Sequence, residues 1–105
     1  MRIVMVLISG FLFTTAAGAA CFEDIGCTDS QKFKDKALAR LNCENLWFTR
    51  NTIYDENGYC FNTDRGAASF DNSDCQYSKQ NSVPLNSYER YNVKAVKRAE
   101  KKKHC

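Results

Sequence analysis

Apolar residues recur at helical spacing in the middle of the chain. Four of them fall on one side of a helical wheel: Leu46, Trp47, Ile53 and Tyr54. Asn42 precedes this run, and its side chain suits a helix N-cap. Gly58 follows the run, and glycine ends helices because it adopts the left-handed conformation without steric cost. The pattern predicts a helix at about 43–57.

A second apolar stripe lies near the C-terminus. It consists of Tyr88, Ala95, Val96 and Ala99, with Tyr91 at its edge. Asn86 is a good N-cap, and Glu89 stands three residues later, where its carboxylate can reach back to the cap amide. The last turn is basic, which suits the negative end of a helix dipole. These signals predict a helix at about 86–103.

The remaining segments carry weaker signals. Residues 30–40 predict a weaker helix, capped by Asp29 or Ser30. Residues 59–84 are rich in turn formers and form an irregular middle, in which 64–70 supplies one or two helical turns. The fold class expected is therefore mainly α: a small domain with two principal helices, a weaker N-terminal helix and an irregular middle.

The start of the chain differs in composition from the rest. Arg2 is the only charge before residue 21, residues 3–13 are almost continuously apolar, and small residues fill 16–20. This order is typical of a secretory signal peptide, and the apolar run is too short to span a bilayer, which takes about 20 residues. We expect residues 1–20 to be a signal peptide and the mature protein to be periplasmic or secreted, without a transmembrane span.

Two cleavage points fit this leader. Ala17 and Ala19 form an Ala-x-Ala pattern that places cleavage after Ala19. Cleavage after Ala20 would make Cys21 the first residue, which opens a lipoprotein alternative. Gly18 argues against lipidation, because a large aliphatic residue is usual three positions before a lipidated cysteine. A lipid on Cys21 would also leave five cysteines, which cannot all pair.

The chain contains six cysteines, all after residue 20. In an exported chain an even number is most simply a disulfide framework, which supplements the limited core of a small domain. We expect structural disulfides and favour the pairs Cys21–Cys27, Cys60–Cys75 and Cys43–Cys105. The last pair follows if the two main helices pack antiparallel, because Cys43 begins one helix and Cys105 ends the other. Other connectivities stay open.

The stretch at 50–61 resembles the YARHG domain family. It reads Arg-Asn-Thr-Ile-Tyr-Asp-Glu-Asn-Gly-Tyr-Cys-Phe, and the family is named for a Tyr-Ala-Arg-His-Gly motif that follows an Arg-Asn-x-Ile stretch. Further features match in order: Leu46-Trp47, Phe61, Phe70, Pro84-Leu85-Asn86 and Glu89-Arg90. The resemblance covers roughly 42–105, so we assign 42–105 to a YARHG-like domain and 21–41 to an N-terminal extension with a local cysteine pair.

The resemblance implies an accessory module of small exported bacterial proteins, and it implies no established molecular function. Only Tyr54 and Gly58 of the naming motif are present, because Asp55, Glu56 and Asn57 occupy its middle. Any role that needs the motif histidine is therefore missing.

Catalytic chemistry has weak support in the sequence. His104 is the only histidine and lies in a lysine-rich tail, where no third group could hold it as a base. No cysteine spacing suits zinc or redox chemistry. The adjacent carboxylates Asp55 and Glu56 would point about 100° apart on a helix, and Glu23 and Asp24 are likewise neighbours in the chain. We expect no enzyme activity, no cofactor and no metal.

Arg50 falls in the middle of the apolar stripe of the first long helix. An arginine there must meet an anion or several carbonyls, because an unpaired buried charge is very costly. The simpler interpretation is an internal clamp to Glu89, Asp64 or loop carbonyls. The functional alternative is an anchor for an acidic group of a ligand.

Lys101, Lys102 and Lys103 form the second candidate binding site. The simpler interpretation is a solvated helix end, and the functional one is a salt-sensitive contact with the anionic cell envelope. Export and near-neutral overall charge disfavour nucleic acid as a partner. The function expected is a non-catalytic extracytoplasmic module that binds an envelope component or an exported protein. The alternative is an exported inhibitor or toxin-like effector.

Overall fold

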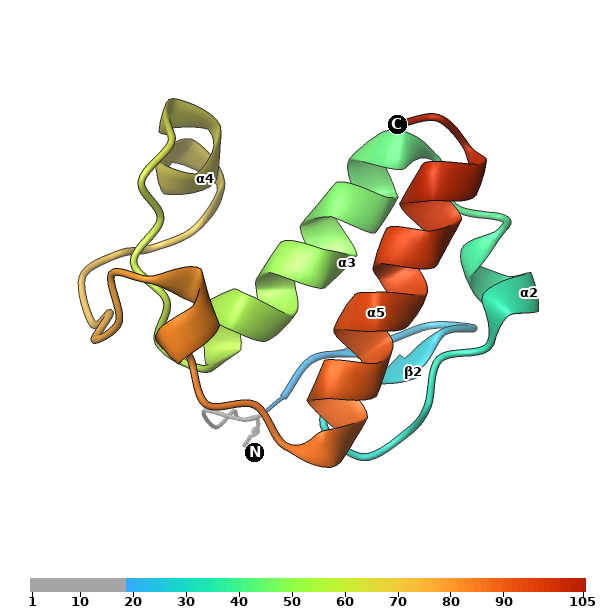
Figure 1. Cartoon of the computed structure of the whole chain (residues 1–105), viewed down its shortest axis with the longest axis horizontal. Helices are drawn as coiled ribbons and strands as arrows, with labels where there is room; N and C mark the ends of the chain where they lie inside the picture. The colour runs from blue at the N-terminus through green and yellow to red at the C-terminus, as the bar shows by residue number, and fades with distance from the viewer. Residues whose placement is uncertain (1–18) are drawn as a thin grey trace, which may run out of the picture.

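The structure is a computed structural model that describes residues 19–105. The predicted signal peptide therefore lies outside the described residues, apart from Ala19 and Ala20. The described part is mainly helical, as expected (Figure 1). Its elements, in order, are β1 (Cys21–Phe22), β2 (Gly26–Cys27), α2 (Asp35–Leu38), α3 (Cys43–Glu56), α4 (Asp64–Ser69), the 3-10 turn η2 (Gln80–Ser82) and α5 (Ser87–Lys102).

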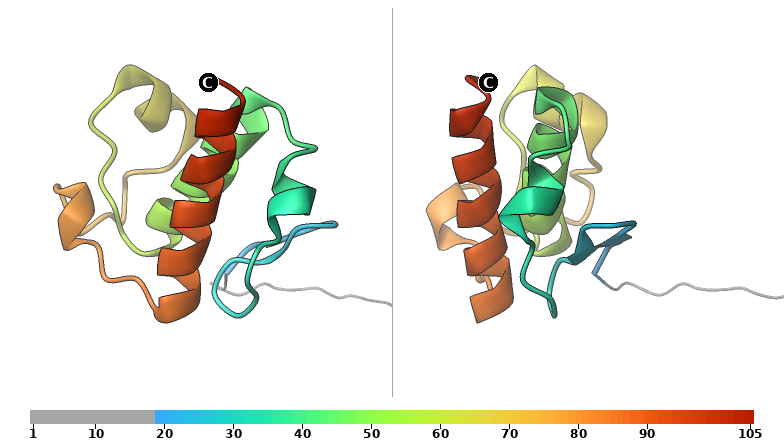
Figure 2. Two further views of the ribbon diagram at one scale, coloured as in Figure 1. Left: turned by 45° about the vertical axis from the view of Figure 1, so that its right-hand side comes forward. Right: turned by 90° about the vertical axis from the view of Figure 1, so that its right-hand side faces the viewer.

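Helices α3 and α5 are the two principal helices, and they pack side by side in opposite directions. The segment before α3 lies on one side of this pair, and α4 with the following loop lies on the other (Figure 2). One hydrophobic core draws on all of these parts: Phe33, Leu38, Leu46, Ile53, Tyr54, Phe61, Val83, Val93, Ala95, Val96 and Ala99. Among residues 19–105, no helix is long and apolar enough to cross a membrane.

Helix α3 has the ends that its sequence predicts. The Asn42 side chain accepts a hydrogen bond of 2.8 Å from the Asn45 amide at the start. At the other end the Gly58 amide donates to the Asp55 carbonyl, and the Tyr59 amide donates to the Tyr54 carbonyl. This pair of bonds is the Schellman arrangement, and it requires the left-handed backbone that Gly58 adopts with φ of 92°.

Helix α5 begins with the predicted capping box between Asn86 and Glu89. Its buried face, however, differs from the expected one. Tyr88 and Tyr91 are 40% and 37% exposed, whereas Glu89 and Asn92 are buried. The placement of Tyr88 in the core stripe was therefore wrong, because two polar residues with satisfied hydrogen bonds occupy the inward positions.

The N-terminal helix is shorter than predicted. Only Asp35–Leu38 is helical, and no side chain of Asp29 or Ser30 caps it, because Lys34 is its N-cap residue. The cause is Asn92 of α5, which is fully buried. Its amide nitrogen donates to the carbonyls of Thr28 and Gln31, and its oxygen accepts from the Phe33 amide. Side-chain bonds thus replace helical ones along 28–33.

The irregular middle contains the short helix expected at 64–70. Helix α4 spans Asp64–Ser69, and the Thr63 side chain accepts from the Gly66 amide at its start. An isolated β-bridge between Tyr59 and Tyr77 joins the segment before α4 to the segment after it.

Three disulfides join the pairs that the sequence favoured: Cys21–Cys27, Cys43–Cys105 and Cys60–Cys75. The first closes the β1–β2 hairpin, in which Cys21 lies opposite Cys27. The second joins the start of α3 to the end of the chain after α5, which is the consequence of their antiparallel packing. The third closes the loop that contains α4.

Candidate functional site

Arg50 of α3 is an internal clamp in this structure. Its Nε donates to Glu100 Oε1 at 2.7 Å and its Nη2 donates to Glu100 Oε2 at 3.1 Å. The two side chains are only 18% and 16% exposed. A bidentate pair of this kind satisfies both charges away from bulk water. The expected partners, Glu89, Asp64 or loop carbonyls, were wrong, because the packing of α5 on α3 brings Glu100 of α5 to Arg50.

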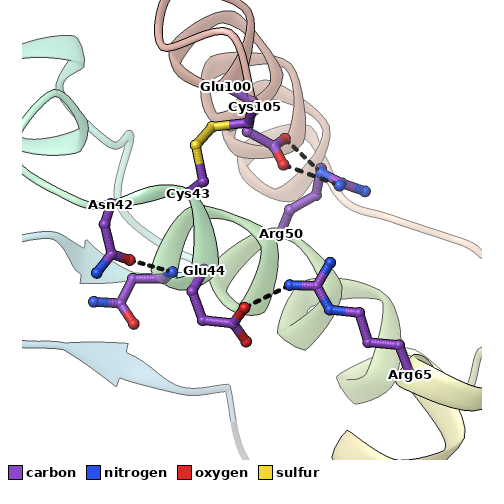
Figure 3. Close-up of a disulfide and its surroundings, with 8 residues drawn as sticks. Asn42, Cys43, Glu44, Arg50, Arg65, Glu100 and Cys105 are labelled. Carbon is purple, nitrogen blue, oxygen red and sulfur yellow. Dashed lines mark hydrogen bonds and ion pairs between the residues drawn. A yellow bond between two sulfur atoms is a disulfide. The ribbon is translucent and has the colours of Figure 1, made fainter.

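The Cys43–Cys105 disulfide lies beside this ion pair (Figure 3). Covalent and ionic links therefore join α3 and α5 at the same end of the molecule. This end also carries the three candidate lysines, Lys101 and Lys102 in the last turn of α5 and Lys103 as its C-cap residue. The chain around them is held at both sides, by the helix before and by the disulfide after.

All three lysines are exposed to solvent. Two of them border a hollow of about 130 Å³ between α2 and α5, lined by Asp35, Ala39, Arg98, Ala99, Lys102 and Lys103. Arg98 donates to Asp35 at 3.2 Å, but both side chains are largely exposed, so the pair is weak. Around this hollow the basic side chains of Arg98, Lys102 and Lys103 therefore outnumber the one carboxylate of Asp35. Arg50 is not among the residues that line it.

An aromatic cluster on the α4 side of α3 was missed by the sequence analysis. Phe70 stacks on Phe61 with centroids 4.7 Å apart and on Phe48 with centroids 5.2 Å apart. The Arg65 guanidinium lies 3.8 Å from the centre of the Trp47 ring. Its Nη2 also donates to Glu44 at 2.7 Å (Figure 3). These residues are too far apart in the sequence for a local pattern to predict that they touch.

The family-motif residues Tyr54 and Gly58 stabilise the C-terminal end of α3 and do not form a binding surface. Tyr54 is buried, and its ring meets Tyr59 edge-on with centroids 6.0 Å apart. Burial raises the pKa of the Tyr54 hydroxyl. The Asn57 side chain donates to the Ile53 carbonyl and to Glu89 Oε2. Tyr54, Asn57 and Gly58 together fix the turn that follows α3.

The neighbouring carboxylates Asp55 and Glu56 have separate surroundings. Burial raises the pKa of both side chains; the Asp71 charge adds to the effect on Asp55, and hydrogen bonds from Thr28 and Ala20 oppose it at Glu56. Glu56 contacts the N-terminal segment, so the two carboxyl groups do not share a cleft. In the described part of the chain, no group of three or more His, Cys, Asp or Glu residues could hold a metal ion. His104 is exposed, in the tail after α5.

Comparison with known proteins supplies one match. The sequence model of the YARHG domain matches residues 23–101. Neither a curated protein nor a solved structure matches the chain. The family match takes in residues before 42, and the core likewise includes Phe33 and Leu38; the domain boundary at 42 stays a prediction. Because the match covers most of its length, the chain belongs to the YARHG domain family.

Proposed function

We propose that this protein is a non-catalytic extracytoplasmic module whose basic end binds an anionic component of the cell envelope. The observation that carries the proposal is the exposed run Lys101–Lys103, held beside the cationic hollow by the Cys43–Cys105 disulfide. A charged surface on a fixed backbone loses less conformational freedom on binding than a free tail does. Extracytoplasmic location is supported by three disulfides and by the family.

Arg50 is unsuited to be the ligand anchor. Its Nε and Nη2 atoms already donate hydrogen bonds to Glu100, and this ion pair is largely shielded from water. A ligand carboxylate would have to displace Glu100 and leave that charge unpaired, which is costly. The proposed contact surface is therefore confined to Lys101, Lys102 and Lys103 with Arg98 beside them.

A sedimentation assay with isolated cell envelope tests this proposal. The oxidised protein is expected to bind at low ionic strength and to dissociate as salt rises, because exposed charges are screened. Replacement of Lys101, Lys102 and Lys103 by Gln should abolish most of the binding. The matched control replaces Lys32, Lys34 and Lys79, which are exposed and lie outside α5. Equal loss in both variants would mean nonspecific attraction, and unchanged binding of the first variant would end the proposal.

An exported inhibitor of another protein is the second candidate. It is favoured by a hollow of about 200 Å³ between the β1–β2 hairpin and α3, lined by Phe22, Glu23, Ile25, Leu41, Asn45, Phe48 and Thr49. Phe48, which is 41% exposed overall, is one of the lining residues, and exposed aromatic residues are common anchors of protein interfaces. Inhibition assays with an envelope protease and with lysozyme test it. Inhibition that disappears in Phe48→Ser supports this candidate, and inactivity against both enzymes speaks against it.

A further inference from the structure

The carboxylate of Glu56, in the last turn of α3, holds the segment where the mature chain is expected to begin. Its Oε2 accepts from the backbone nitrogen of Ala20, and its Oε1 accepts from Thr28 Oγ1 at 2.8 Å. The Ala20 carbonyl in turn accepts from the Thr28 amide at 3.0 Å. Both backbone polar groups of Ala20 are therefore bound to the folded domain, and Thr28 is fully buried.

The surroundings of Glu56 are negatively charged. Burial raises the pKa of the Glu56 carboxyl, and the negative charges of Glu89 and Asp29 raise it further. The hydrogen bonds from Thr28 and Ala20 act in the opposite direction and lower this pKa. The ion pairs found among residues 19–105 join Arg50 to Glu100, Arg65 to Glu44 and Arg98 to Asp35, and none of them includes Glu56. A half-buried carboxylate among like charges favours a nearby cation.

Removal of the leader would create such a cation at the bound atom. Ala17 and Ala19 fit a leader-peptidase site after Ala19. Water then adds across the Ala19–Ala20 amide, which leaves a carboxylate on Ala19 and an amine on Ala20. That amine takes up a proton at neutral pH, since α-amino groups have a pKa of about 7.7–8.0.

We propose that leader cleavage occurs after Ala19 and that the new α-ammonium group of Ala20 forms an ion pair with Glu56. Processing thereby replaces an uncharged amide donor by an ammonium, so that an ion pair ties the mature N-terminus to the end of α3. Cleavage after Ala20 would remove both backbone bonds of this residue. The Cys21–Cys27 disulfide also occupies the sulfur that a lipid anchor would need, which agrees with a free amine on Ala20.

The first test is the intact mass of the oxidised protein after export with its own leader. A chain that begins at Ala20 is expected, and a chain that begins at Cys21 would overturn the proposal. The second test is an NMR titration of the α-amine in this protein. The ion pair should raise the proton affinity of the amine about tenfold, and Glu56→Gln should remove that increase. An amine that titrates identically in both proteins would also overturn it.

A glycine inserted between Ala19 and Ala20 supplies a variant that retains Glu56. It moves the ammonium by about 3.8 Å, so its amine should titrate near the ordinary value. Glu23→Gln, at an exposed carboxylate in the same segment, is the matched control and should leave the amine unchanged. The ion pair also makes the stability of the folded protein depend on pH. Because the folded amine has the raised pKa, the added stability is complete below about pH 7.7 and is lost as pH rises through the folded pKa.

Discussion

Two buried polar residues of α5, Asn92 and Glu89, hold neighbouring segments of the chain through hydrogen bonds. Asn92 makes three hydrogen bonds to the backbone of 28–33, and Glu89 accepts from the Asn86 amide and from Asn57. Buried polar groups of this kind are costly when a partner is removed, because the remaining donors and acceptors have no water to replace it. Asn92 therefore specifies the path of the N-terminal segment, in addition to filling space.

We predict that Asn92→Ala lowers the free energy of unfolding by about 2–4 kcal/mol, since it leaves three backbone groups without a partner. Urea unfolding of the oxidised protein measures this loss. Lys94→Ala, at an exposed position of the same helix, should change the free energy by less than about 0.5 kcal/mol. A comparable loss in both variants would show that Asn92 has no special role.

At the scale of elements, Tyr54 and Gly58, the two residues that the chain shares with the family's naming motif, both act at the C-terminal end of α3. Both contribute to the turn that reverses the chain into the Cys60–Cys75 loop. The Gly58 carbonyl also accepts from the amides of Gln76 and Tyr77, at 2.7 Å and 3.0 Å. Tyr54 and Gly58 are thus structural in this chain.

Gly58→Ala is expected to destabilise the protein by about 1–2 kcal/mol. The φ of 92° is unfavourable for a residue with Cβ, and the added atom would lie 3.3 Å from the Tyr77 ring. Thermal unfolding followed by circular dichroism measures the change. Ala68→Ser, at an exposed site in α4, provides the control. An unchanged unfolding midpoint in Gly58→Ala would contradict the role assigned to the turn.

The Arg50–Glu100 pair couples α3 to α5, and it should behave as a coupled unit. Arg50→Met and Glu100→Gln are each expected to cost about 1–3 kcal/mol, because each leaves the other group unpaired and shielded from water. The double variant should lose less than the sum of the two, by about 1 kcal/mol or more. Denaturant unfolding of all four proteins gives this coupling. Strict additivity would mean that the pair contributes nothing.

At the scale of the whole molecule, the disulfides constrain very different lengths of chain. Cys43–Cys105 spans a sequence separation of 62, against 6 for Cys21–Cys27. A crosslink that closes a longer loop removes more entropy from the unfolded chain. The long crosslink joins the two principal helices, whereas the short one closes a two-stranded hairpin.

We therefore predict a large difference between two double variants. Replacement of Cys43 and Cys105 by Ser should cost about 4 kcal/mol, and replacement of Cys21 and Cys27 about 2 kcal/mol. Unfolding midpoints of the two oxidised proteins test this order, with peptide mapping to show that the remaining pairs are native. Equal losses, or a larger loss for the short pair, would contradict it.

Features that depend on neighbouring residues could be predicted without the fold. Helix α3, helix α5, the short helix α4 and their caps at Asn42 and Asn86 all follow from periodicity and capping chemistry, which act within a few residues. The Cys43–Cys105 pair follows from antiparallel packing of the two long helices, because that packing brings both cysteines to one end.

The pairing of polar groups far apart in the chain, in contrast, depends on how the helices and loops pack. Asn92 shortens the N-terminal helix from 59 residues away along the sequence, and Arg50 reaches Glu100 across 50. Glu56 binds Ala20 across 36 residues. No local pattern encodes these contacts, because a buried polar side chain takes whichever partner the packing of helices and loops brings within hydrogen-bond reach.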